Sequence, residues 1–540
     1  MTSNQWSRRS TLRLIGAAGL APVVAGTGTL QNRASAQSAP SARSARSDLD
    51  ARIQEIVRRP EFPESRWGMR FQLLGSDRPV YTMNSDQLFT TGSSFKVFPG
   101  GTAFSTLGPD YRFRTRVYRA GPVAHGVLRG DLILVASGDL LIGGRIRRDG
   151  SLALPDPDHS YGSVPLPGDP IQGLREIAAQ VRRAGIRRIE GRVRVDASLF
   201  RKGYADIALG GLKIPVVPMM TNDNLVDVTV TPGRRAGQPA RLRLTPDIGY
   251  VDVRNEVVTV ASPEDARPLA YADETERPDG TRTVRLTGAV PLDGGDMYRP
   301  YYLQDPVRYA ELAFTEALRD ACIKLAETSS PSVDAADAAD AADLRRYRTP
   351  GNQVAVRVSP PLSEAIKVML KVSSNIHTAY FPYLVGAIAG HDAENPKERG
   401  ERFQHALLRS AGLDPEPAGS ADHKYAPDYF VPYLTYLTSR SFFPQFHAAL
   451  PIMGRDGTLS DVQVDSPAAG HVFAKTGSAG GRQPDGRSRI AKALAGYIEL
   501  PGGRTVAFTE FMETYTEFGK IPSAGEALGE IATAVYEELA

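Results

Sequence analysis

The stretch Ser93-Ser94-Phe95-Lys96 is the first of three short motifs that decide how this sequence is interpreted. It is followed by Ser373-Ser374-Asn375 and then by Lys475-Thr476-Gly477. Each motif occurs once in the 540 residues, and no other lysine has a serine three positions before it. One such motif could be a helix cap beside a surface lysine, but three unique motifs in this order indicate a common site.

Ser93 and Lys96 carry the chemistry of the first motif. Residues three apart share one face of a helix, so the hydroxyl and the amine would be neighbours. A serine hydroxyl is a weak nucleophile without an adjacent base, and Lys96 can be that base if burial or a nearby cation lowers its pKa. We expect Lys475 to supply the charge and Ser373 to relay the proton. Asn375 has a donor and an acceptor, which suits an amide.

The third motif and the residue after it fall in a predicted strand, which contains Thr476, Gly477 and Ser478. The edge of a strand beside the nucleophile can pair with an extended peptide. We expect the side chains of Lys475 and Thr476 to hold a terminal carboxylate. The backbone N–H groups of Ser93 and Ser478 would form an oxyanion hole for the attacked carbonyl group.

Composition excludes several classes of protein. A chain of 540 residues predicts roughly three domains, and 41% hydrophobic with 23% charged residues is typical of a globular protein. The net charge of +3 and the lack of a basic block argue against a nucleic-acid partner. The eight histidines are scattered, without an HExxH motif or paired cysteines, so we expect no metal and no other cofactor.

Two kinds of segment alternate along the chain. Short β-rich runs fill residues 112–301, with one amphipathic helix near Ile171–Ala184. Residues 51–111 and 302–540 carry most of the helical patterns, and strand patterns follow the third motif. The first motif precedes the β-rich block and the other two follow it. The sequence therefore predicts an α+β catalytic domain of helices and antiparallel sheet, interrupted by β-rich inserted domains, one nested in the other.

The first 36 residues have the pattern of an export signal. Ser7–Leu12 resembles a twin-arginine motif, an apolar run follows from Leu14 to about Gly28, and Ala34–Ala36 fits a cleavage site. Residues 37–50 are expected to be a flexible leader. No later apolar run reaches the length of a membrane-spanning helix. We therefore expect an exported, periplasmic or otherwise extracytoplasmic protein, with at most peripheral contact with the membrane.

Together the motifs resemble the D-alanyl-D-alanine carboxypeptidase/endopeptidases of the class C low-molecular-mass penicillin-binding proteins. Met369–Asn375 reads MLKVSSN and is similar to the family's MLKxSDN; Leu450–Leu459 reads LPIMGRDGTL and is similar to LPVAGxDGTL. Leu494–Tyr497 resembles the family's LSGY strand, and similarity covers most of residues 50–540. The resemblance implies a transpeptidase domain of the penicillin-binding-protein and β-lactamase type, split by nested β-rich inserts.

The resemblance also implies individual roles. Ser93 would be the acylated nucleophile and Lys96 its base. Asp196 matches an insert position that in the family can face the free amino end of the peptidoglycan stem peptide; an ordinary turn residue is the equally weighted alternative. Lys424 stands where the family has an arginine, so it would bind a carboxylate without a bidentate grip.

Two further departures concern the surroundings of the motifs. Ser374 replaces the usual aspartate of the second motif, at a variable position. An extra loop, rich in glycine and arginine, is predicted from Gly480 to Ser488. These changes bear on substrate recognition more than on the type of reaction.

The sequence thus predicts a serine-type D-Ala-D-Ala carboxypeptidase or endopeptidase. Its partners would be peptidoglycan peptides as substrates and β-lactams as covalent inhibitors. A β-lactamase or esterase with the same acylation chemistry is one alternative, and a catalytically inactive cell-wall-binding protein is another. The motifs do not distinguish these possibilities, because they do not report how fast an acyl-enzyme is hydrolysed.

Overall fold

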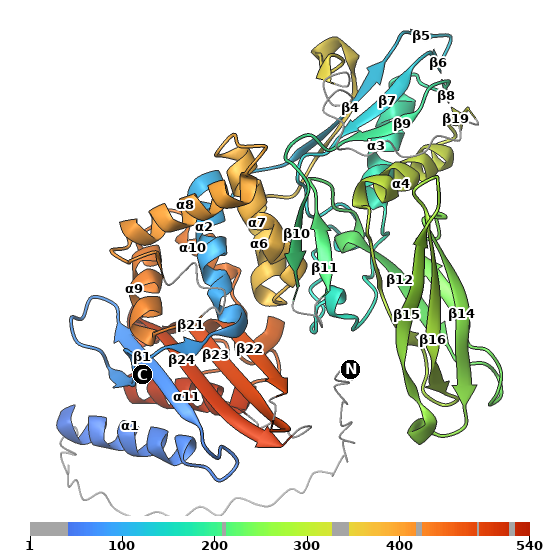
Figure 1. Ribbon diagram of the computed structural model, residues 1–540. Coiled ribbons are helices and arrows are strands. Elements are labelled where there is room, and N and C mark those ends of the chain that lie inside the picture. Colours follow the sequence, from blue (N-terminus) through green and yellow to red (C-terminus); the bar gives the residue numbers. More distant parts are fainter. Residues whose placement is uncertain (1–41, 208–211, 327–344, 417–423, 483–484, 518–523) are drawn as a thin grey trace, which may run out of the picture.

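The computed structural model describes residues 42–207, 212–326, 345–416, 424–482, 485–517 and 524–540. The predicted export signal lies outside these residues. Among the described helices, none has both the length and the apolar character needed to span a membrane. Two bodies lie side by side, which we call the main body and the insert (Figure 1). The insert comprises residues 114–358 and the main body the described residues on either side of it.

A five-stranded antiparallel sheet forms the centre of the main body, in the order β2-β1-β24-β23-β22. N-terminal strands therefore lie beside C-terminal ones, and β1 pairs with β24 from Arg66 opposite Glu513 to Leu73 opposite Val506. This pairing closes the main body around the chain that leaves for the insert and returns. The strands are β1 Arg66–Leu73, β2 Tyr81–Met83, β22 Val472–Arg482, β23 Arg487–Glu499 and β24 Thr505–Glu517.

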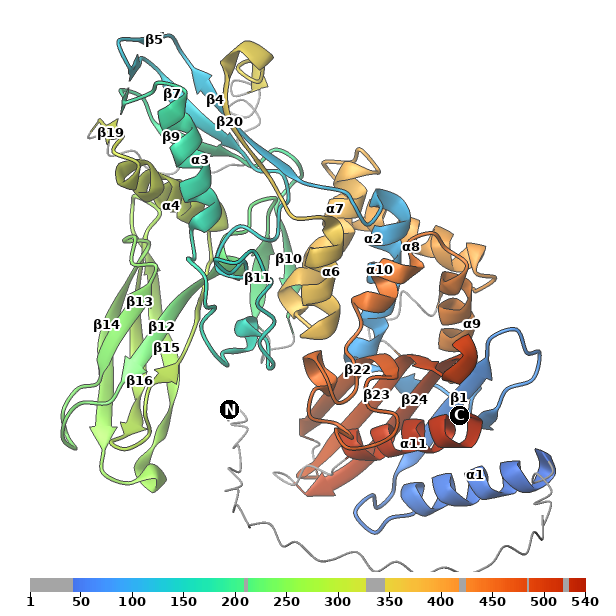
Figure 2. The ribbon, with the colours of Figure 1, turned by 180° about the vertical axis from the view of Figure 1, so that it is seen from behind.

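Helices cover both faces of this sheet (Figure 2). Side chains alternate across a strand, so Leu494 and Ile498 face one helical layer while Ala495 and Tyr497 face the other. The first layer consists of α1 Ala42–Val57 and α11 Ala524–Leu539. The second consists of α2 Val97–Leu107, α6 Leu362–Lys371, α7 Asn375–Ile388, α8 Pro396–Ser410, α9 Pro427–Thr438 and α10 Phe443–Ala448. A short pair, β3 Phe89–Thr90 and β21 Lys424–Tyr425, lies beside it.

The start of α1 differs from the sequence prediction. Residues 42–50, expected to be flexible, are helical. Leu49, Ile53 and Ile56 recur at helical spacing and are buried against the sheet and α11. This apolar face explains why the chain is ordered before residue 51.

The insert contains a four-stranded sheet in the order β20-β4-β7-β9, covered by two helices. The chain enters it through β4 and leaves through β20, which pair with each other. The bounds are β4 Arg114–Ala120, β7 Asp131–Val135, β9 Val193–Asp196, β20 Gln353–Val358, α3 Gln172–Arg183 and α4 Pro306–Asp320. A second small sheet adjoins it, with β5 Val123–Ala124, β6 Val127–Leu128, β8 Arg188–Ile189 and β19 Lys324–Leu325.

The remaining strands of the insert form separate β-rich units. A hairpin of β10 Gly203–Asp206 and β11 Lys213–Val216 lies next to α6 and α7 in both views (Figures 1 and 2). A separate unit is a three-stranded sheet in the order β14-β16-β15. Its strands are β14 Val251–Val260, β15 Arg267–Glu276 and β16 Arg282–Pro291. A further sheet consists of β12 Leu225–Thr231, β13 Arg241–Thr245, β17 Met297–Tyr298 and β18 Tyr301–Tyr302.

The predicted fold class is confirmed: helices and an antiparallel sheet are interrupted by β-rich units. The limits of the insert differ, because the sequence assigned residues 302–540 to the main body. Instead α4 buries Tyr309 and Phe314 in the core of the insert, and β20 pairs with β4. The amphipathic face of α4 thus finds its partner in the insert.

The loop predicted for Gly480–Ser488 is also corrected. β22 and β23 continue into it as a hairpin, with Gly480 opposite Ile490 and Gly481 opposite Arg489. Arg489 holds this end of the hairpin against the main body, because its guanidinium donates hydrogen bonds to Thr90 and to Glu513. Glycine is a weak strand former, so the sequence pattern alone suggested a loop.

Candidate active site

The first and third motifs meet where a short 3₁₀ turn contacts the edge strand β22. This turn, η1 Gly92–Lys96, leads directly into α2 and carries Ser93. Two glycines permit the backbones to touch. A Cβ on Gly92 would lie 2.6 Å from Ser478 N, and a Cβ on Gly477 would lie 2.0 Å from Thr91 O. Gly92 also has a φ of +49°, which side-chain-bearing residues rarely adopt.

Ser373 brings the second motif to the same point. It lies between α6 and α7, is almost fully buried, and has a φ of +58°. Its Oγ accepts hydrogen bonds from Lys475 Nζ at 2.9 Å and from Lys96 Nζ at 3.2 Å. Its carbonyl oxygen accepts a further bond from Lys96 Nζ at 2.5 Å. One serine hydroxyl thus bridges two lysines from different motifs.

The two lysines, which we call the lysine pair, are fully desolvated. Burial holds the pKa of Lys96 well below its usual value, and the charge of Lys475 lowers it further, against Asp158. Burial lowers the pKa of Lys475 to about 7, against Asp156. Among the described residues, no carboxylate lies within ion-pair distance of either ammonium group. The site therefore favours a neutral lysine, as a lysine base requires.

Asn375 and Thr476 also contact the lysine pair, and with Ser373 these residues form what we call the cluster. Asn375 Oδ1 accepts from Lys96 Nζ at 2.6 Å, which orients its amide, and its Nδ2 donates to the carbonyl oxygen of Ile207 at 2.8 Å. Lys475 Nζ also donates to Thr476 O at 2.8 Å, and Thr476 Oγ1 lies 2.7 Å from Thr458 Oγ1. These contacts leave few rotamers open to the polar side chains at the centre.

Ser93 itself is only partly buried, beside this cluster. Within the described part of the chain, no hydrogen bond joins it to Lys96, whose Nζ contacts the second motif instead. The exposed Ser478 lies next to the Ser93 turn, and its Oγ accepts from Lys492 Nζ at 2.9 Å. The structure thus brings the predicted catalytic residues and the Lys475–Ser478 strand to one place.

Two segments next to the second and third motifs support the cluster. Lys371 Nζ donates to both carboxylate oxygens of Asp456, at 2.8 and 2.7 Å, and to Leu450 O at 2.8 Å. This joins MLKVSSN to LPIMGRDGTL and holds the loop that carries Thr458. Ser374, which stands where the resembled family has aspartate, caps α7 by accepting from His377 N at 3.4 Å.

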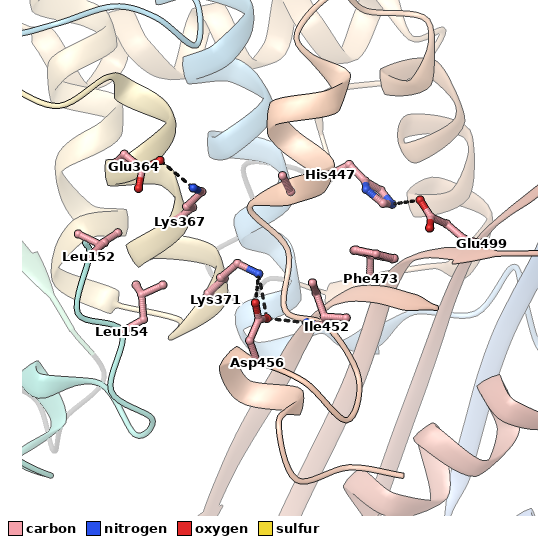
Figure 3. A pocket seen from close by; sticks show the side chains of 11 residues that line it. Leu152, Leu154, Glu364, Lys367, Lys371, His447, Ile452, Asp456, Phe473 and Glu499 are labelled. Atoms are coloured by element: carbon pink, nitrogen blue, oxygen red, sulfur yellow. Dashed lines mark hydrogen bonds and ion pairs between the residues drawn. The ribbon is translucent and has the colours of Figure 1, made fainter. Parts of the chain in front are cut away.

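A cleft of about 470 Å³ lies beside the cluster, between the insert and the main body (Figure 3). Leu152 and Leu154 of the insert form one wall, Lys371 and Asp456 lie at the centre, and Phe473 lies on the far side. None of the motif residues Ser93, Ser373 or Lys475 lines it. The cleft therefore adjoins the cluster without containing it.

The insert contributes residues to the cluster that the sequence did not point to. Tyr161 OH donates to the carbonyl oxygen of Ser373 at 2.5 Å. Asp156 interacts electrostatically with Lys475, and partial burial raises the pKa of Asp156 to about 6. Ile207 accepts from Asn375, as described above. These residues belong to no recognisable motif, so only the fold reveals them.

A second buried polar cluster, the insert ion cluster, contacts α7. It consists of Arg145, Asp158, His159, Asp223 and Asp227, each no more than 2% exposed. Arg145 NH2 bonds to Asp158 at 2.7 Å and to Asp223 at 2.6 Å. His159 lies 2.9 Å from Asp223 and 2.7 Å from Asp227 through its two ring nitrogens.

This cluster connects the insert to the main body. His377 of α7, two residues after Asn375, lies 3.0 Å from Asp223 through its Nε2. Burial lowers the pKa of His159, but the carboxylates of Asp223 and Asp227 outweigh it and raise the pKa to about 9. No sequence motif pointed to the insert residues of this cluster.

The two remaining predicted residues, Asp196 and Lys424, lie on two other strands, β9 and β21. Asp196 ends β9, and its carboxylate pairs with Arg348 and accepts from Ser198 N at 3.0 Å. Its contact with a substrate stays a prediction. Lys424 is half-buried on β21, opposite Thr90. It thus lies opposite a residue that stands two positions before the Ser93 turn begins at Gly92.

Comparisons with known proteins agree with this geometry. D-alanyl-D-alanine carboxypeptidase of Actinomadura sp. (strain R39) is 24% identical over 486 residues, covering 85% of this chain and 79% of the relative. D-alanyl-D-alanine carboxypeptidase DacB of Haemophilus influenzae is 22% identical over 482 residues, covering 84% and 87%. The crystal structure of penicillin binding protein 4 (dacB) from Haemophilus influenzae has a TM-score of 0.63 at 19% identity, covering 90% and 99%.

The family comparison covers nearly the whole described chain. The model of the D-Ala-D-Ala carboxypeptidase 3 (S13) family matches residues 49–533, which include all three motifs and the insert. The resemblance inferred from the motifs is thereby confirmed. This protein belongs to the D-Ala-D-Ala carboxypeptidase 3 (S13) family of serine peptidases.

Proposed function

We propose that this protein removes or releases the terminal D-alanine of peptidoglycan stem peptides through an acyl-enzyme on Ser93. The observation that carries the proposal is the convergence of two buried lysines on Ser373 Oγ, beside the Ser93 turn. A buried, unpaired lysine is a poor structural element but an effective base. Family membership and the names of the relatives support the same substrate class.

Acylation would begin with the Ser93 hydroxyl attacking the carbonyl carbon of the penultimate D-alanine. Neutral Lys96 takes the hydroxyl proton, and the backbone N–H groups of Ser93 and Ser478 bind the developing oxyanion. Ser373 Oγ passes the proton to the nitrogen of the leaving D-alanine, since it contacts both lysines. Water then attacks the ester and restores Ser93.

Substrate binding would use the edge of β22. The peptide extends along this strand, and its terminal carboxylate meets Lys475 and Thr476. Asn375 holds the substrate amide, because its own amide is oriented by Lys96 and Ile207. β-Lactams carry a reactive amide and a carboxylate in a similar arrangement, so we expect them to acylate Ser93. A related structure, at 20% identity, was solved in complex with a β-lactam.

Labelling with a fluorescent penicillin tests the proposal. We expect a covalent label on the unaltered protein and none on Ser93→Ala. Ser94→Ala is a matched control, because Ser94 Oγ donates to Thr91 O at 2.9 Å and is fully buried away from substrate. No label on the unaltered protein would contradict the proposal and favour a non-catalytic wall-binding role.

A second assay separates the peptidase from a β-lactamase. The release of D-alanine from a stem-peptide analogue is compared with turnover of a chromogenic β-lactam. We expect the first to be continuous and the second to stop after one equivalent. Mass spectrometry of muropeptides after digestion then shows whether free D-alanine or cleaved cross-links accumulate.

The site of action would be outside the cytoplasm, where peptidoglycan lies. The export pattern of residues 1–36 supports this proposal, with the twin-arginine route as its specific form. Fusing these residues to a reporter and replacing Arg8 and Arg9 by lysine tests the route. We expect export of the fusion to be lost in the double variant.

A further inference from the structure

The backbone of Ser373 adopts a conformation that its neighbours must maintain. Its φ of +58° lies in the left-handed region, which a serine adopts only where the surroundings fix it. This conformation aims Oγ between Lys96 and Lys475 and turns the carbonyl oxygen toward the insert. Whatever holds the carbonyl group also sets the direction of the hydroxyl.

Two donors meet at that carbonyl oxygen. One is Lys96 Nζ and the other is Tyr161 OH, each at 2.5 Å. A carbonyl oxygen has two lone pairs, so these bonds use its full capacity. Burial raises the pKa of Tyr161, and the charge of Asp158 raises it further, so the phenol keeps its proton. Tyr161 therefore acts as a donor throughout the working pH range.

The insert ion cluster holds Tyr161 in place. Tyr161 ends the short 3₁₀ turn η2 His159–Tyr161, which Asp158 caps by accepting from Ser160 N at 3.3 Å. Asp158 and His159 are themselves bound to Arg145, Asp223 and Asp227. The phenol thus projects from a turn whose capping residue, Asp158, and first residue, His159, both belong to a buried ionic network.

We propose that Tyr161 is a positioning residue of the active site, supplied by the insert, which fixes Ser373 for proton transfer between the two lysines. The proposal rests on the proposed function and gives the insert ion cluster a role in it. Tyr161 forms no bond with substrate in this role. It acts by sharing the Ser373 carbonyl oxygen with Lys96.

This sharing has a measurable consequence for Lys96. The groups around its amine are Ser373, Asn375 and Tyr161, with the charges of Lys475 from β22 and Asp158 from the insert. Without the phenol, the carbonyl oxygen is left to Lys96 alone, which favours the charged ammonium form. The pKa of Lys96 then rises, and acylation requires a higher pH.

The test compares Tyr161→Phe with Tyr302→Phe. Tyr302 OH also donates to a backbone carbonyl of this turn, Ser160 O at 2.5 Å, but does not touch the Ser373 group. The second-order rate constant for acylation by a fluorescent penicillin is measured across pH for both variants and the unaltered protein. We expect roughly tenfold slower acylation for Tyr161→Phe, the typical effect of one lost buried hydrogen bond. Its acid limb should move to higher pH.

Three outcomes decide the question. Slower acylation with a shifted acid limb, seen for Tyr161→Phe and not for Tyr302→Phe, supports the proposal. An unchanged limb, whatever the rate, overturns it, because a merely structural role lowers the active fraction equally at every pH. Failure of the unaltered protein to label overturns the proposed function itself. Circular dichroism confirms folding, and Tyr161→Leu replaces Tyr161→Phe if that variant does not fold.

Discussion

The lysine pair and the insert ion cluster are equally buried but have opposite charge balance. In the described part of the chain, Lys96 and Lys475 have only neutral oxygens within hydrogen-bond distance, and their pKa values fall. Arg145 and His159 face three carboxylates, and the pKa of His159 rises to about 9. Burial alone therefore does not set the protonation state. A base needs desolvation without a counter-ion, whereas an anchor needs desolvation with full pairing.

Removing the proposed base of the lysine pair should have the largest effect on the rate of acylation. We expect Lys96→Met to lower the rate of acylation by about 10³- to 10⁴-fold, because methionine keeps the length of the side chain but cannot accept a proton. The measurement is the second-order rate constant for labelling with a fluorescent penicillin. The fold should be retained, since no buried carboxylate loses its partner. A rate within about tenfold of the unaltered protein would show that another group is the base.

Removing one carboxylate of the insert ion cluster should instead lower the free energy of unfolding. We expect Asp223→Asn to destabilise the protein by about 3–5 kcal/mol, because Arg145 and His159 lose a shared carboxylate in a dry environment. Urea unfolding measures this change. Asp252→Asn is the matched control, since its ion pair with Arg277 is exposed and worth about 0–1 kcal/mol. Equal effects of the two substitutions would contradict the account.

The titration of His159 in the insert ion cluster should make the stability of the protein depend on pH. The folded pKa of His159, about 9, exceeds its unfolded value of about 6.5. Its stabilisation is therefore fully present below about pH 6.5 and is lost as pH rises through about 9, a change of about 3 kcal/mol. Urea unfolding at about pH 6 and about pH 9.5 measures this, and the difference should shrink in His159→Gln. A change of the same size in His159→Gln would assign it to other groups.

The lysine pair should show its own pH dependence in the rate. Lys475 has a pKa of about 7, so its charge is lost as pH rises through that value. When Lys475 loses its charge, the site loses the cation proposed to bind the carboxylate of the substrate. The pKa of Lys96 also rises, because the charge of Lys475 had lowered it. We therefore expect acylation to decline by up to about tenfold per pH unit above neutrality. Lys475→Arg stays charged and should shift this limb to higher pH; an identical limb would exclude Lys475 as its origin.

The sequence predicted one of these two clusters and missed the other, for a physical reason. The chemistry proposed for Ser93, Lys96, Ser373 and Lys475 is one that few residue types support, so these residues stand in recognisable motifs. The insert ion cluster uses residues that are usually exposed. Only tertiary packing makes them buried partners, and Arg145 and Asp223 are distant in sequence.

The same reason explains the errors in the fold. The class of fold and the interruption by β-rich units followed from local patterns and the order of motifs. The return of the chain at β20 depends on pairing with β4, and the extended β22–β23 hairpin depends on Arg489 reaching Glu513. The role of Asp196 follows from the resemblance alone and stays a prediction; in the structure its carboxylate pairs with Arg348. Long-range contacts of this kind leave no local signal.

The central claim is that Ser93 is the residue acylated by the site that the lysine pair forms. Digestion of β-lactam-treated protein followed by mass spectrometry of the peptides tests it directly. The account predicts one adduct, on the peptide that carries Ser93 and on that serine. An adduct on Ser94 or Ser373, or no adduct at a saturating concentration of β-lactam, would contradict it.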